Sequence, residues 1–83
     1  MIVFLEWRPK EKIKTMSELW IYDLGGRALI EGKPSKIDVK PGPTSSFTWW
    51  KADITSLKPG IYRVDVLIDS NAIWRAFFKV RES

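Results

Sequence analysis

Apolar and polar residues alternate with a period of two along most of the chain, as in β-strands that bury one face. The clearest example is GIYRVDVLI (60–68), in which Arg63 and Asp65 occupy positions between apolar residues. The turn residues DSN (69–71) follow, and AIWRAFFKVRE (72–82) alternates again. These two runs predict an antiparallel hairpin that ends the domain.

The same alternation predicts further strands upstream. They are IVFLEW at 2–7, ELWIYD at 18–23, RALIEG at 27–32, KIDV at 36–39 and FTWWKADI at 47–54. The polar residues 8–17 are expected to form a connector, and Pro34, Pro41 and Pro43 exclude a helix around the fourth segment. Six or seven short strands separated by turn residues predict an all-β fold, either a sandwich or a small barrel.

The segment LKPGIYRVDV (57–66) resembles the corner that leads into a strand of fibronectin type III and other immunoglobulin-like bacterial domains. Pro59 and Gly60 allow the chain to turn sharply between sheets. Tyr62 can bury its ring while its hydroxyl reaches back to the corner backbone. The closing AFFKV (76–80) is similar to the last strand of such modules. The resemblance implies an immunoglobulin-like β-sandwich of about six to seven antiparallel strands.

The 83 residues predict a single domain spanning 1–83. Five Trp, four Phe and two Tyr supply a substantial core and argue against disorder. The start, MIVFLEWRPK, lacks the pattern of a secretory signal, and no apolar run approaches the roughly 20 residues of a membrane helix. The resemblance implies a bacterial module of the cell envelope or of a secreted protein. We therefore expect an extracellular or periplasmic location, a longer exported precursor and no membrane insertion of this segment.

Several classes of chemistry lack the residues they need. The chain has no Cys and no His, so disulfides, thiolate zinc sites and histidine general bases are excluded. DLGGR (23–27) lacks the ending of a phosphate-binding loop, and DSN (69–71) offers too few oxygen ligands for Ca²⁺. The net charge of +4 comes from interspersed signs, which gives no nucleic-acid footprint. We expect a protein that is not an enzyme and that holds no cofactor or metal.

Trp49 and Trp50 are neighbours in a predicted strand, so their side chains point to opposite faces. One register buries Trp50, Ala52 and Ile54 and exposes Phe47, Trp49 and Lys51. The opposite register buries Phe47 and Trp49 and exposes Trp50. We favour the first, because it continues the apolar row to Ile54 and leaves Lys51 in water. Either register leaves one indole on the outer face.

Three other predicted strands also carry large apolar residues on both faces. Those on the second face are Ile2 and Phe4, Trp20 and Tyr22, and Ile73 and Phe77. A free-standing antiparallel sheet normally has one polar side. Loops can cover these residues, the proline-rich 33–46 segment being one candidate lid, and barrel-like curling of the sheet can hide others. Otherwise the residues form an interaction surface.

Trp, Tyr, Phe and Arg are enriched in protein interfaces. The candidate binding residues are Trp49, Trp50, Phe77, Arg63, Arg75 and Tyr22. We expect a non-catalytic binding or assembly module that docks a protein partner, or copies of itself, in the cell envelope. An aromatic-rich sheet face or an open strand edge would make the contact. The alternative is a carbohydrate-binding module that stacks the sugar rings of a polysaccharide on exposed Trp.

Overall fold

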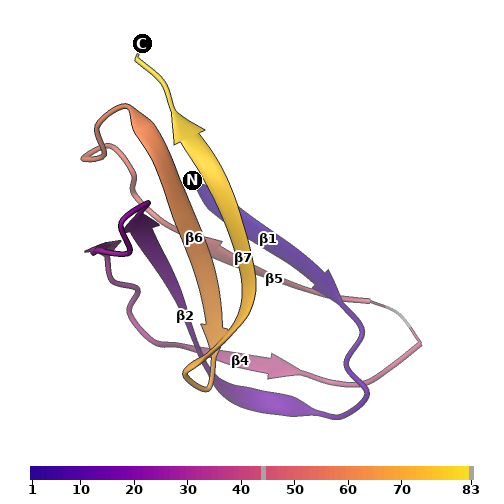
Figure 1. The fold of residues 1–83 in the computed structure, drawn as a ribbon. Helices are drawn as coiled ribbons and strands as arrows, with labels where there is room; N and C mark the ends of the chain where they lie inside the picture. The colour runs from indigo at the N-terminus through magenta and orange to yellow at the C-terminus, as the bar shows by residue number, and fades with distance from the viewer. Residues whose placement is uncertain (44, 83) are drawn as a thin grey trace.

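The computed structural model describes residues 1–43 and 45–82, and in this part of the chain every regular element is a β-strand (Figure 1). The strands are β1 (Ile2–Trp7), β2 (Ile13–Asp23), β3 (Ala28–Ile30), β4 (Ser35–Val39), β5 (Ser46–Lys51), β6 (Gly60–Ile68) and β7 (Asn71–Val80). The all-β prediction is therefore confirmed. Over the same residues, no helix is long and apolar enough to cross a membrane.

The strands form two antiparallel sheets of unequal width. Among the described residues, β1 pairs with β5 alone, and the larger sheet has the order β3-β2-β6-β7. β4 also pairs with β2, and because Ser17 pairs with both Ser35 of β4 and Ile68 of β6, β4 lies on the edge of β2 away from β6. β3 and β4 thus follow one another along the same edge. Figure 1 shows the β1–β5 pair lying behind β6 and β7.

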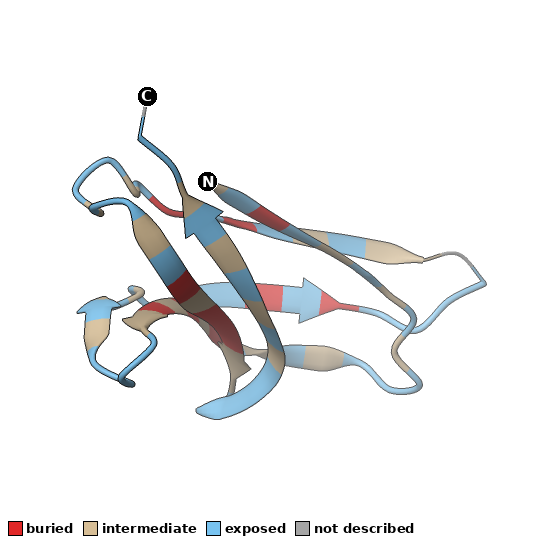
Figure 2. Ribbon diagram, turned by 45° about the horizontal axis from the view of Figure 1, so that its top comes forward, coloured by how far each residue is buried: buried red, intermediate tan, exposed pale blue. Residues whose placement is uncertain are grey.

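The core lies between the two sheets (Figure 2). Ile21 and Val66 from the larger sheet are fully buried, and Val3 and Trp50 contribute from the β1–β5 pair. The Trp50 indole Nε1 donates a hydrogen bond of 2.8 Å to the buried Ser17 hydroxyl, which joins the two sheets. The register that turns Trp50 inward is confirmed.

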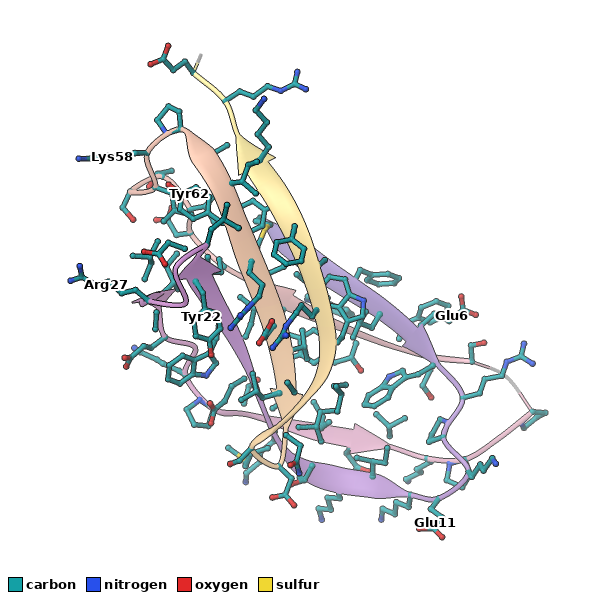
Figure 3. All side chains as sticks on the ribbon, in the orientation of Figure 1. Glu6, Glu11, Tyr22, Arg27, Lys58 and Tyr62 are labelled. Atoms are coloured by element: carbon teal, nitrogen blue, oxygen red, sulfur yellow. The ribbon has the colours of Figure 1, made fainter. Side chains whose placement is uncertain are left out.

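The corner before β6 has the local geometry expected from its sequence. The ring of Tyr62 is buried and stacks on Phe78, with 5.7 Å between the ring centroids. Its hydroxyl donates a hydrogen bond to the backbone carbonyl of Lys58, and Figure 3 labels both residues. The hydroxyl therefore anchors the corner to the core.

The closing hairpin is also as predicted. β6 and β7 pair from Gly60 opposite Val80 to Ile68 opposite Asn71. Asp69 and Ser70 have positive φ angles of 51° and 65°, the geometry of a two-residue turn that suits the strand twist.

One prediction is wrong in part. Residues 8–17 do not all form a connector, because β2 begins at Ile13 and its first half pairs with β4. The inward positions here include Thr15 and Ser17, so the apolar alternation that signals a strand is missing. Pairing with β4 supplies the order instead.

Candidate functional site

The outward side of β1 and β5 is an exposed aromatic surface, here called the β1–β5 face. Its outward residues are Ile2, Phe4 and Glu6 of β1 and Phe47, Trp49 and Lys51 of β5. Trp49 is 65% exposed, Ile2 63%, Phe4 57% and Phe47 54%. They alternate with the inward residues of the same strands, so burying Trp50 obliges Trp49 to face solvent.

Strand pairing brings these side chains into one patch. Phe4 lies directly opposite Trp49 in the ladder. The Phe4 ring also stacks on Phe47, with centroids 5.3 Å apart and planes 23° from parallel. Three aromatic side chains, each more than half exposed, present roughly 350 Å² of surface. A contiguous apolar patch of this size is often functional.

Charged residues occupy two opposite corners of the patch. Ile2 lies opposite Lys51 at one end, and Glu6 lies opposite Phe47 at the other. Both charged residues are exposed, and Figure 3 shows Glu6 pointing away from the body of the molecule. The face therefore has an aromatic centre with one acid and one base placed diagonally.

The outward side of β2, β6 and β7 forms a second surface, here called the large-sheet face. One row across these strands is Tyr22, Arg63 and Phe77, and the next is Trp20, Asp65 and Arg75. Phe77 is 62% exposed, whereas Asp65 is buried beneath its neighbours.

The charges on the large-sheet face are paired with one another. Arg75 donates two hydrogen bonds to Asp65, of 2.9 and 3.1 Å, and the Nε atom of Arg63 lies 3.4 Å from the same carboxylate. The hydrogen bond and charge of Asp65 raise the pKa of Arg75. Arg63 also lies over the ring of Tyr22, 4.3 Å from its centroid, and Tyr22 stacks on Trp20. These contacts occupy both oxygens of the Asp65 carboxylate, whereas the buried Nε atom of Arg63 has no hydrogen-bond partner among the described residues.

The structure divides the candidate residues among three places. Tyr22, Arg63, Arg75 and Phe77 lie together on the large-sheet face, Trp49 lies on the β1–β5 face, and Trp50 lies in the core. The expectation of one face bearing Trp49 or Trp50 together with Phe77 and the arginines is wrong, because the tryptophan on the large-sheet face is Trp20. Because β5 and β7 belong to sheets that face each other, their outward residues point in opposite directions.

Three residues of the β1–β5 face were not among the candidates. Ile2, Phe4 and Phe47 point outward by their alternation, and that signal was available in the sequence. The sequence contains no local signal that these residues lie around Trp49, because β1 and β5 pair across more than 35 intervening residues.

The lid expected from the 33–46 segment does not cover either face. Apart from Thr44, which lies outside the described residues, this segment forms β4 and its connections, and β4 pairs with β2. Trp49 and Phe77 keep most of their surface in solvent. The aromatic residues are thus accessible to a partner.

A shallow pocket of about 500 Å³ adjoins the free edge of β5. Leu19 and Trp50 line it, and charged residues such as Lys33 and Asp53 surround it. Within residues 1–43 and 45–82, no three acidic side chains are grouped as a metal site requires. The pocket has balanced charges and offers no evident chemistry.

Comparison with known proteins gave no match to any family model, curated protein or solved structure. The similarity of the Leu57–Val66 corner to immunoglobulin-like modules thus stays a prediction. The function must be argued from the two faces.

Proposed function

We propose that this chain is a non-catalytic binding module that docks a protein surface through the β1–β5 face. The observation that carries the proposal is the contiguous exposure of Phe4, Phe47 and Trp49 on the outward side of a two-stranded sheet. The solvent side of an antiparallel sheet is normally polar, so exposed aromatics there cost solubility unless a partner covers them.

The β1–β5 face supports docking better than the large-sheet face does. Arg63 and Arg75 are already paired with Asp65, so a partner that recruited them would have to replace those contacts. Within residues 1–43 and 45–82, the aromatic rings around Trp49 form no ion pair, and their one ring contact is the Phe4–Phe47 stack. Burying them in a partner removes apolar surface from water without breaking an ion pair.

Binding of a polysaccharide is the second candidate. The stacked rings of Phe4 and Phe47 beside Trp49 offer aromatic surfaces on which sugars can stack. However, four of the six outward positions are hydrophobic residues, and Glu6, Lys51 and the indole N–H of Trp49 are the side-chain groups there that can hydrogen-bond sugar hydroxyls. Protein docking fits this composition better. The resemblance to bacterial modules implies a partner in the cell envelope or in a secreted assembly.

Site-specific photo-crosslinking tests the proposal. A benzoylphenylalanine in place of Trp49 should, on irradiation in the producing cells, give a discrete protein adduct. The matched control places the same residue at Phe77, which is equally exposed on the opposite face and should give none. Adducts from position 77 alone, or equally from both positions, would contradict the proposal. So would retention on an insoluble polysaccharide that is lost in Trp49→Ala, since that result favours sugar binding.

A further inference from the structure

We infer that the protein surface docked by the β1–β5 face is the same face of a second copy, related by a two-fold axis that runs across the strands. This inference rests on the proposed function and adds the identity of the partner. It is carried by the placement of charges around the aromatic centre.

The charges alternate in opposite order at the two ends of the face. At one end, Glu6 is followed two residues later by Arg8, whose Nε atom donates a hydrogen bond of 3.0 Å to Ser45. At the other end, Lys51 is followed two residues later by Asp53. All four charged side chains are exposed. Counted outward from the aromatic centre, β1 therefore carries an acid and then a base, whereas β5 carries a base and then an acid.

Two copies can pack their β1–β5 faces against each other around a two-fold axis in two orientations. When the two-fold axis runs across the strands, the second copy is reversed end for end. Glu6 then lies beside Lys51 of the second copy, Arg8 lies beside its Asp53, and symmetry repeats both pairs. When the axis runs along the strands, Glu6 approaches Glu6 and Lys51 approaches Lys51 instead. Opposite charges therefore favour the reversed packing, and like charges oppose the other.

The aromatic centre fits the same packing. Phe4 and Trp49 form the middle rung of the ladder, so the axis runs along this rung and each lies over its equivalent. Phe47 lies under the second copy's Lys51, whose aliphatic stem can cover the ring. With Ile2 and the charged rim included, the two copies would bury on the order of 1,000 Å² in total, which is the low end for a specific interface. The expected dimer is reversible.

Sedimentation velocity of the full chain over a roughly hundredfold concentration range, up to about 1 mM, tests the inference. The wild type should shift from 9.7 kDa toward twice that mass as its concentration rises. Trp49→Asp should stay a monomer, because it puts a charge at the centre of the interface. Phe77→Asp, on the opposite face, should behave as the wild type.

A charge-exchange experiment tests the orientation. Glu6→Lys and Lys51→Glu should each weaken self-association by roughly tenfold, since each variant creates two like-charge contacts per dimer. An equimolar mixture should dimerise again. Each mixed dimer pairs the introduced lysine of one variant with the introduced glutamate of the other, and it retains one native pair of Glu6 with Lys51. Recovery in the mixture also shows that both variants are folded.

The outcomes separate this inference from the proposed function. A wild type that remains a monomer up to about 1 mM overturns the inference. If the crosslinker at position 49 still captures a different protein, docking through this face stands without self-recognition. A wild type that dimerises while both single variants dimerise equally well overturns the reversed packing. Dimers abolished by Phe77→Asp but not by Trp49→Asp overturn both proposals.

Discussion

Trp50 of one sheet donates its indole hydrogen to the fully buried hydroxyl of Ser17 in the other, at 2.8 Å. Ser17 in turn lies 3.3 Å from the backbone carbonyl of Ser35, so its hydroxyl can accept from Trp50 and donate to β4. This chain of contacts holds Trp50 in the core. Because β5 alternates, the same contact keeps Trp49 in solvent.

Ser17→Ala should therefore destabilise the protein. It leaves the Trp50 Nε1 hydrogen buried without an acceptor, which costs about 1–3 kcal/mol. The free energy of unfolding from urea titration measures the effect. Ser56→Ala, at an exposed loop position, is the control and should change it by less than about 0.5 kcal/mol. Equal effects of the two substitutions would contradict a structural role for the Ser17 hydroxyl.

Tyr62→Phe removes only the hydroxyl that bonds the Lys58 carbonyl. The expected loss is about 0.5–1.5 kcal/mol of unfolding free energy, since the ring and its stacking on Phe78 remain. Tyr22→Phe makes the same chemical change on the large-sheet face, where the tyrosine contributes its ring to Arg63. It should have a smaller effect. A larger effect from Tyr22→Phe would show that the corner bond contributes little.

Gly32 is required where β3 gives way to β4. A Cβ atom there would lie 2.6 Å from the backbone nitrogen of Leu19 and 2.8 Å from its carbonyl carbon. Gly32→Ala must push the backbone at position 32 away from that of Leu19. This should lower the free energy of unfolding by about 3 kcal/mol or more. Gly42→Ala is the matched control, because nothing lies within 4 Å of its added methyl. Similar melting temperatures for the two variants would rule out this close approach.

The pKa of Asp53 should lie below its ordinary value of 3.8, because the carboxylate accepts hydrogen bonds from the backbone N–H and from the hydroxyl of Thr55. The backbone bond has the larger effect. Because this pKa is lowered, the ionised Asp53 carboxylate stabilises the folded state fully at neutral pH. The stabilisation is lost only as the pH falls through the folded-state pKa. Thr55→Val keeps the backbone bond and removes the other, so the pKa should rise part of the way toward 3.8. Carboxyl NMR titration measures both values, and an unchanged pKa in Thr55→Val would contradict the assignment.

The features that the sequence predicted correctly are those that leave a signal within one strand or one hairpin. The β6–β7 hairpin follows from alternation on both sides of a two-residue turn, and the inward direction of Trp50 follows from the apolar row that continues to Ile54. The Tyr62 corner is likewise contained within a few residues. In each case the signal lies in residues close in sequence, although the contact that holds Trp50 inward comes from the distant Ser17.

The parts that sequence could not predict depend on pairing between distant strands. β1 and β5 have no turn between them that marks them as partners, so the patch that joins Phe4, Phe47 and Trp49 was not foreseen. For the same reason Phe77 was expected on one face with Trp49, although the two residues belong to different sheets. The start of β2 was missed because its order comes from β4 rather than from its own apolar residues.

Burial of the β1–β5 face can be measured by hydroxyl-radical footprinting of the wild-type protein at roughly 1 μM and 1 mM. Self-docking through this face predicts that oxidation of Trp49 and Phe4 falls at the higher concentration while that of Phe77 stays constant. Unchanged oxidation of Trp49 and Phe4, or protection confined to Phe77, would contradict it.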